Sequence, residues 1–112
     1  MKTKHTGKKY DEGKPKAWSF ITNFPLALQC VAELDTIGAE KYSAGGWREV
    51  EDGEQRYMEA FSRHTLKLAA GEVYDEGKDG TGKPHKAAML WNLLCTLELE
   101  LESGEVESDA RG

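Results

Sequence analysis

Apolar residues recur at helical spacing in three segments of the chain. The first segment follows Asn23, a residue type that often caps helices, and Pro25, which suits the first turn of a helix. Its apolar positions are Leu26, Ala27, Cys30, Val31, Leu34 and Ile37. The pattern ends near Tyr42, before the glycines of SAGGW. It predicts a first helix that begins after Asn23 and ends near Tyr42.

A second helical pattern begins after Asp52. Asp52 and Gln55 are three residues apart, as in a capping box. The apolar stripe that follows contains Tyr57, Ala60, Phe61, His64 and Leu68. If this helix continues through Gly71, two carboxylates, Glu72 and Asp75, face the same side as the stripe. The spacing alone leaves open whether the helix passes through Gly71 or stops there.

The third helical pattern is the longest. Pro84 suits its first position, and Gly104 suits its end. Its stripe contains Leu90, Leu93, Leu94, Leu97 and Leu101. The alternation in TLELELE continues this segment without a break, so we predict a helix there and not a strand.

The three patterns together predict an all-α fold, a bundle of about three main helices preceded by an extended N-terminal arm. We expect one domain over residues 1–112, with a basic arm at 1–22, a helical core at 23–103 and an acidic tail at 104–112. These helices carry more leucine than one small bundle can bury. We therefore expect a homo-oligomer, a dimer or larger, that covers parts of the third helix and Trp91.

Composition and charge narrow the environment and the partners. No apolar run approaches the roughly 20 residues of a membrane span, and no apolar signal segment follows the lysine-rich N-terminus. The formal net charge of -5 argues against nonspecific binding to duplex nucleic acid. Cys30 and Cys95 lie inside helical patterns and are predicted to be buried free thiols. We expect a cytoplasmic protein that binds neither duplex nucleic acid nor a membrane.

Carboxylates lie near the inner faces of the first two predicted helices. Glu33 and Glu40 are seven residues apart on the first helix, and Glu72, Asp75 and Glu76 follow the second. Negative charge at a helix C-terminus is unfavourable, and a bound divalent cation would offset it. Carboxylate oxygens are the ligands that Mg²⁺ prefers. Each of these residues also suits an ordinary boundary or loop position, so the pattern alone does not decide whether they bind a metal ion.

Two polar residues of the third helix, His85 and Asn92, share one face. A histidine near a helix start is often a cap or surface residue, whereas an amide deep in a leucine-rich segment needs hydrogen-bond partners.

A calcium loop of the EF-hand type is excluded in the glycine-rich stretch that begins at Asp75. Gly77 and Lys86 stand where a loop starting at Asp75 would need oxygen ligands.

Four segments of the chain, in this order, carry a family resemblance: TGKKYDEGKPKAW, GAEKYSAGGWRE, RYMEAFSRHTLKLAAGEVYDEG and PHKAAMLWN. They resemble the phage and bacterial dATP/dGTP diphosphohydrolase-type domain, a relative of the MazG-like all-α nucleotide pyrophosphohydrolases. The resemblance covers roughly residues 7–92. It implies cleavage between the α- and β-phosphates of a purine deoxynucleotide such as dATP or dGTP, giving the monophosphate and pyrophosphate. If the chain is phage-encoded, its location would be the host cytoplasm.

The resemblance also implies a metal site. Glu72 and Asp75 match an E-x-x-D metal motif, and Glu33 resembles the first half of this motif only loosely. These three carboxylates would hold Mg²⁺ or Mn²⁺, which would neutralise the phosphates and help to position or activate the attacking water. This interpretation favours a helix that runs through Gly71.

Further residues of the matching motifs are expected to act on the nucleotide. Glu40 or Glu76 would accept the proton of the attacking water, and His64 would orient the metal site. The expected nucleotide-binding residues are cations, aromatic residues and polar residues: Lys9, Lys14, Lys41, Tyr42, Trp47, Arg48, Arg56, Arg63, His85 and Asn92.

Three departures from the family pattern leave alternatives open. Gly46 replaces an asparagine before Trp47, Ala88 replaces a second histidine, and the segment between Asp75 and His85 is longer. These changes are compatible with a protein of the same fold that binds or sequesters a nucleotide without hydrolysing it. A third interpretation is a helical protein-interaction module that uses its acidic tail and binds no nucleotide.

Overall fold

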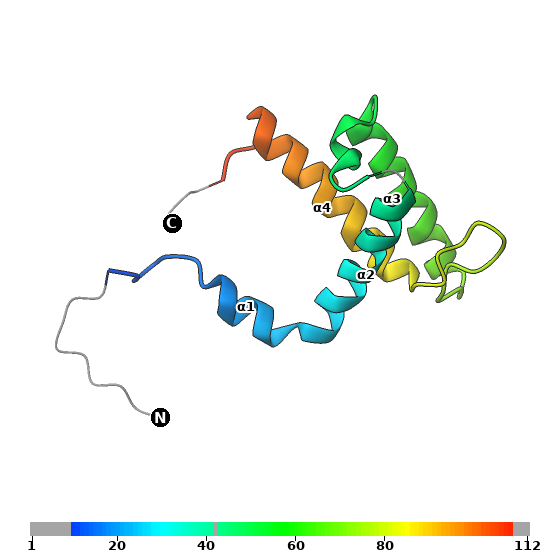
Figure 1. The fold of residues 1–112 in the computed structure, drawn as a ribbon, viewed down its shortest axis with the longest axis horizontal. Coiled ribbons are helices and arrows are strands. Elements are labelled where there is room, and N and C mark those ends of the chain that lie inside the picture. Colours follow the sequence, from blue (N-terminus) through cyan, green and yellow to red (C-terminus); the bar gives the residue numbers. More distant parts are fainter. Residues whose placement is uncertain (1–9, 42, 109–112) are drawn as a thin grey trace.

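The structure describes residues 10–41 and 43–108, and in these residues the chain consists of helices joined by loops, with no strand. This computed structural model contains α1 (Ala17–Asn23), α2 (Pro25–Lys41), the 3-10 helix η1 (Gly46–Glu49), α3 (Gly53–Ala69) and α4 (His85–Ser103). Helices α3 and α4 pack together most extensively, and α2 packs against α4 (Figure 1). The all-α prediction is confirmed. None of these helices is both long and apolar enough to cross a membrane.

Helix α4 supplies most of the buried side chains. Its buried positions are His85, Ala87, Ala88, Asn92, Cys95 and Thr96. The buried amide of Asn92 donates its Nδ2 hydrogen to the main-chain oxygen of Ala88 at 2.7 Å. The hydroxyl of Thr96 donates to the main-chain oxygen of Leu93 at 3.0 Å. These polar side chains are therefore satisfied within their own helix, which allows α4 to lie in the centre of the fold.

The start of the chain differs from the prediction. Helix α1 occupies the end of the predicted extended arm, and Asn23 is its last residue, not the N-cap of the next helix. Pro25 begins α2, as predicted for the first turn. Because proline lacks an N–H group, it cannot extend α1, and the chain starts a new helix there. Helix α1 has seven residues, too few for a hydrophobic period to reveal it.

The caps of the longer helices agree with the prediction only in part. The prediction of a capping box is wrong, because the side chain of Asp52 makes no capping hydrogen bond and Gln55 donates to Glu59 at 2.8 Å instead. Asp52 has φ 56, a left-handed conformation that aspartate tolerates better than most residues. The predicted stop at Gly104 is confirmed, with φ 84. Pro84 lies one residue before the first position of α4.

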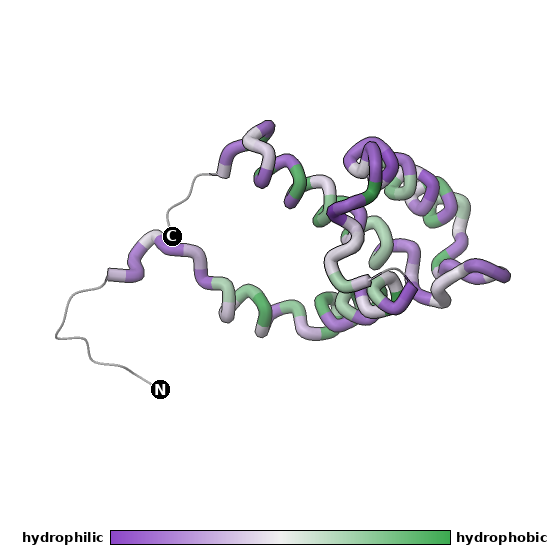
Figure 2. The backbone as a smooth tube through the Cα atoms, turned by 45° about the horizontal axis from the view of Figure 1, so that its top comes forward, coloured by the Kyte–Doolittle hydropathy of each residue, from purple (hydrophilic) through white to green (hydrophobic). Residues whose placement is uncertain are grey.

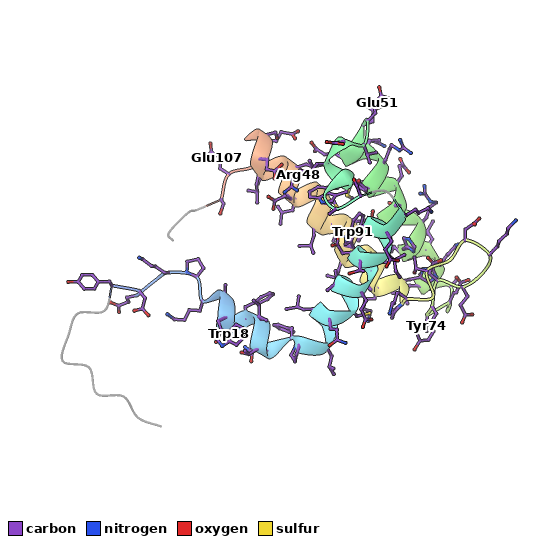
Figure 3. All side chains as sticks on the ribbon, in the orientation of Figure 1. Trp18, Arg48, Glu51, Tyr74, Trp91 and Glu107 are labelled. Carbon is purple, nitrogen blue, oxygen red and sulfur yellow. The ribbon has the colours of Figure 1, made fainter. Side chains whose placement is uncertain are left out.

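Large apolar side chains remain exposed on α1, α2 and α4. Trp18 on α1 is 75% exposed, Leu26 at the start of α2 is 84% exposed, and Leu94 on α4 is 55% exposed. Figure 2 shows hydrophobic stretches along these helices, and Figure 3 shows Trp18 on the helix that extends away from α3 and α4. The Cα radius of gyration is 17.7 Å, against about 13 Å for a compact domain of this length. A single chain therefore does not close a core around these faces.

We propose that a second copy of the chain covers these faces, and we expect a dimer or larger assembly at micromolar concentration. Apolar area removed from water is worth about 25 cal/mol per Å². Light scattering should give at least twice the monomer mass of 12.5 kDa. Leu94→Glu should shift the protein toward the monomer, whereas Leu66→Glu, at a 70% exposed position of α3, should not. A monomer for the unmodified protein would contradict the proposal.

The thiol of Cys95 should react slowly in the folded protein. Cys30 and Cys95 are both free thiols, Cys95 buried and Cys30 half-buried. Burial raises the pKa of Cys95 to about 12, so that at pH 8 only about 1 in 10,000 of these thiols is the reactive thiolate. We expect iodoacetamide to modify Cys95 of Cys30→Ser protein at least about a hundred-fold faster in urea than in buffer. Mass spectrometry would measure both rates, and equal rates would contradict burial.

Candidate functional site

Helix α3 stops at Gly71 instead of continuing through it. Gly71 has φ 102, in the left-handed region that favours glycine. Its N–H group donates to the main-chain oxygen of Leu68 at 2.9 Å, and that of Glu72 donates to Lys67 at 3.0 Å. These two hydrogen bonds form a Schellman cap. The prediction of a helix through Gly71 is therefore wrong, and Glu72 and Asp75 do not share a helical face.

The segment after this cap, which we call the 72–84 loop, folds back on itself. Tyr74 and Pro84 form an isolated antiparallel bridge, which is the neck of the loop. The N–H group of Asp75 donates to the main-chain oxygen of Lys83 at 2.8 Å. Asp75 is thereby fixed just beyond the neck, close to the start of α4.

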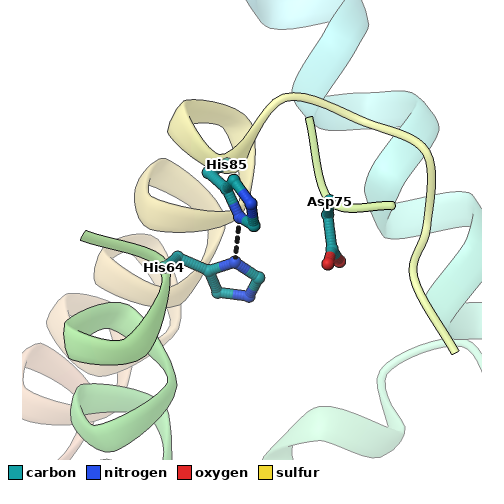
Figure 4. Close-up of side chains that lie close together, drawn as sticks. All are labelled: His64, Asp75 and His85. Atoms are coloured by element: carbon teal, nitrogen blue, oxygen red, sulfur yellow. Dashed lines mark hydrogen bonds between the residues drawn. The ribbon is translucent and has the colours of Figure 1, made fainter. Parts of the chain in front are cut away.

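Contacts within the loop orient the side chain of Asp75. Its Oδ2 accepts hydrogen bonds from the N–H group of Thr81 at 3.3 Å and from the hydroxyl of Thr81 at 3.4 Å. Gly80 passes so close to the main-chain oxygen of Asp75 that a Cβ atom would not fit. Figure 4 shows the resulting position of the carboxylate, beside His64 and His85.

Two imidazoles meet where α3 and α4 pack together. His85 is fully buried, its Nε2 lies 2.7 Å from Oε2 of Glu72, and its Nδ1 lies 2.8 Å from Nδ1 of His64 (Figure 4). Because a carboxylate only accepts, Nε2 of His85 carries the hydrogen that it donates to Glu72, and Nδ1 is the ring nitrogen that faces His64. Burial lowers the pKa of His64, which favours its neutral form. The ligand atoms of His64, Asp75 and His85 all lie within 4.8 Å of one another.

His64 and Asp75 also line a cleft of about 990 Å³ between α2, η1, α3 and α4. This volume lies at the upper end of the range for small-molecule sites. Seven of the predicted site residues line the cleft: Lys41, Trp47, Arg56, Arg63, His64, Asp75 and Asn92. Arg56 and Arg63 are seven residues apart on α3, and His64 follows directly, so one face of α3 turns these groups toward the cleft. The structure therefore brings together residues from three of the four motifs.

Tyr57 and Trp91 extend the predicted Trp47 into an aromatic wall, a role that was not predicted for these two residues from the sequence. The ring of Tyr57 makes edge contacts with Trp47 and Trp91, at centroid distances of 6.4 and 5.6 Å. The hydroxyl of Tyr57 donates to the main-chain oxygen of Trp47 at 2.7 Å, and the indole of Trp91 donates to Asp35 at 2.9 Å. Trp91, expected at an oligomer interface, lines the cleft of its own chain. Its position beside Asn92 in the motif PHKAAMLWN was the only signal for this role.

The other predicted carboxylates do not gather in the cleft. Oε1 of Glu33 lies 2.6 Å from Nζ of Lys83, and the hydrogen bond from this lysine holds the pKa of Glu33 below its usual range. Glu72 is engaged with His85, as described above. Glu40 and Glu76 are exposed and lie outside the cleft lining. Of the predicted metal ligands, only Asp75 faces the cleft.

Some predicted cations and aromatic residues also lie elsewhere. Arg48 donates Nε and Nη2 hydrogens to Glu102 at 3.2 and 3.0 Å and stacks on Trp47, with 4.5 Å between the guanidinium carbon and the ring centroid. Lys14 is exposed near the start of the described chain. Lys9 and Tyr42 lie outside the described residues. Their predicted roles stay predictions.

Comparison with known protein families shows to which family the chain belongs. A family model described as dATP/dGTP diphosphohydrolase, N-terminal, matches residues 4–110. The chain belongs to this family. The match confirms the resemblance carried by the four motifs, and the name of the dATP/dGTP diphosphohydrolase family denotes a hydrolase. No curated protein and no solved structure matches the chain.

The cap that directs Glu72 and Asp75 depends on Gly71. Gly71→Ala places a Cβ atom in the left-handed conformation, which should destabilise the fold by about 1 kcal/mol. Gly38→Ala is the matched control, because Gly38 lies inside α2 and a Cβ there meets nothing within 4 Å. It should stabilise the fold by up to about 1 kcal/mol. Urea unfolding would measure both changes, and the same sign for both would contradict the role of Gly71.

Proposed function

We propose that the protein is a metal-dependent nucleoside triphosphate pyrophosphohydrolase that acts on purine deoxynucleotides such as dATP and dGTP. Water would add across the anhydride between the α- and β-phosphates, and the products would be the monophosphate and pyrophosphate. The observation that carries the proposal is the cleft itself, which gathers Lys41, Arg56 and Arg63 together with Trp47 and the His64–Asp75 corner. Membership of the dATP/dGTP diphosphohydrolase family supports the substrate class.

The cations of the cleft suit a triphosphate. Guanidinium groups bind phosphate oxygens in paired, charge-assisted hydrogen bonds. Within residues 10–41 and 43–108, no carboxylate forms a salt bridge with Arg56 or Arg63. Both arginines are thus available on the face of α3 that lines the cleft. Lys41, at the end of α2, would add a third positive charge.

The aromatic wall suits the base. The hydroxyl of Tyr57 fixes Trp47 near the start of α3. His64 lies seven residues after Tyr57 on α3. Seven residues of α-helix span roughly 10 Å. A purine at Trp47 would therefore place its phosphates along Arg56 and Arg63, toward His64 and Asp75. The exposed guanidinium of Arg48 is already stacked on one face of Trp47, so the base would stack on the other face of this indole.

Hydrolysis requires a divalent cation in this proposal, with Mg²⁺ or Mn²⁺ as the expected ion. The carboxylates expected for an all-protein Mg²⁺ site do not converge, so Mg²⁺ would arrive with the triphosphate and meet the chain at Asp75. Bound there, the cation would neutralise phosphate charge. Glu40 and Glu76 stay predicted proton acceptors whose side chains are exposed. The substrate pool would be that of the cytoplasm.

The proposal predicts product release with a defined set of substrates and variants. Purified protein with Mg²⁺ or Mn²⁺ should convert dATP or dGTP to the monophosphate and pyrophosphate, identified by chromatography and a pyrophosphate assay. Arg63→Gln should lower kcat/KM roughly ten- to a hundred-fold, because a charge-assisted phosphate contact contributes about 1.5–3 kcal/mol. Lys67→Gln is the matched control, since Lys67 is a cation one turn further on α3 that does not line the cleft.

The outcomes separate this function from its alternatives. Tight binding of dATP in calorimetry, with the nucleotide recovered intact for every metal tried, would instead establish a nucleotide-sequestering protein. An absence of both binding and hydrolysis over a full nucleotide panel would leave the interaction module as the remaining interpretation. An equal loss of activity in Arg63→Gln and Lys67→Gln would contradict the proposal that the cleft binds the triphosphate.

A further inference from the structure

The corner formed by α3, the 72–84 loop and α4 brings two imidazoles and one carboxylate to a single point. We propose that His64, Asp75 and His85 bind one divalent transition-metal ion of the kind that takes imidazole ligands, such as Zn²⁺, Co²⁺ or Mn²⁺. These residues are 11 and 10 positions apart in the chain and come from three different elements. Their donor atoms nevertheless all lie within 4.8 Å of one another.

The spacing of the donors suits a shared ion. Zinc binds imidazole nitrogen at about 2.0–2.1 Å, so two neighbouring ligands of one ion lie about 3–3.5 Å apart. The two Nδ1 atoms of His64 and His85 lie 2.8 Å apart, and a small rotation of the half-buried His64 ring would open that distance. His85 is held rigidly, because it is fully buried at the start of α4. The pair is thus close to ligand spacing before any ion is bound.

The partner of His85 on its far nitrogen supports a ligand role. In metal sites, a ligating histidine usually donates its second N–H to a carboxylate or a main-chain oxygen, which fixes the tautomer and the ring orientation. Glu72 accepts from Nε2 of His85 at 2.7 Å, which leaves Nδ1 as the donor to an ion. The carboxylate of Asp75 is itself oriented by Thr81. Two of the three proposed ligands therefore have a supporting hydrogen-bond partner.

The chemistry of the donors selects the ion. Mg²⁺ is bound in proteins by oxygen ligands, whereas imidazole suits zinc, cobalt, nickel, copper and iron, and manganese accepts a mixture. Two nitrogens and one oxygen thus form a poor magnesium site. Because His64 and Asp75 also line the cleft, positions on the ion would remain open toward it, as in catalytic rather than structural metal sites. This last step rests on the proposed function, but binding of the ion does not.

Binding would be measured without nucleotide. Untagged full-length protein would be stripped with a chelator, dialysed and titrated with Co²⁺ while visible absorption is recorded, and with Zn²⁺ by calorimetry. We expect one equivalent of each ion, with Co²⁺ displaced by Zn²⁺ and unaffected by a thousand-fold excess of Mg²⁺. His64→Gln and Asp75→Asn should weaken Zn²⁺ binding by about a hundred-fold or more. Glu72→Gln should weaken it by about ten- to a hundred-fold, as for other supporting partners of metal-bound histidines.

Controls keep the result interpretable. Glu33→Gln changes a carboxylate that is engaged with Lys83 outside the cluster, so it should leave Zn²⁺ affinity unchanged. Circular dichroism of each variant would establish that it folds, and His64 is preferred for substitution because it is only partly buried. If Co²⁺ gives no visible band and Zn²⁺ no saturable binding, or if folded His64→Gln binds as well as the unmodified chain, the cluster is a hydrogen-bonded pair and the proposal is overturned.

The two proposals fail separately. Stoichiometric Zn²⁺ binding that depends on His64, without hydrolysis of any nucleotide, would overturn the proposed function and support the metal site. Hydrolysis sustained by Mg²⁺ alone, in a chain that binds neither Co²⁺ nor Zn²⁺, would do the reverse.

Discussion

A fully buried imidazole must have both of its ring nitrogens satisfied, and His85 meets this requirement with partners from two other parts of the chain. Glu72 belongs to the cap of α3, and His64 lies within α3. One side chain therefore ties the start of α4 to the loop before it and to the helix beside it. An unsatisfied buried polar group costs about 1–3 kcal/mol. That cost is large for a fold whose described core contains so few fully buried apolar side chains.

The cleft depends on a second set of fixed contacts at the other half of α3. The hydroxyl of Tyr57 holds the main chain of Trp47, and the indole of Trp91 holds Asp35 of α2. The contacts of Tyr57 join η1 and α4 to α3, and the indole of Trp91 joins α4 to α2, so four elements form the walls of the cleft. The arginines and His64 follow one face of α3 at helical spacing. A ligand bound in the cleft would therefore be positioned mainly by contacts with α3.

Helical periodicity predicted much of the fold, and motif order predicted part of the site. The three main helices lie close to where the apolar patterns place them, because each pattern is long enough to show its period. Helix α1 is too short to do so. At Gly71, spacing was ambiguous, and the expected metal pair favoured the wrong choice, whereas the preference of glycine for positive φ decides it in the structure. Tertiary ion pairs were beyond prediction, since Lys83 meets Glu33 across 50 positions and Glu102 meets Arg48 across 54.

The narrow neck of the 72–84 loop links the rim of the cleft to the position of Asp75. Tyr74 and Pro84 close the loop at its base, and Asp75 lies directly inside that closure. Residues added or removed between Gly77 and Gly80 would change the rim of the cleft while the histidines stay on their helices. Because Thr81 orients the carboxylate of Asp75, the same change would also move Asp75, so the loop sets the rim of the cleft and one member of the cluster together.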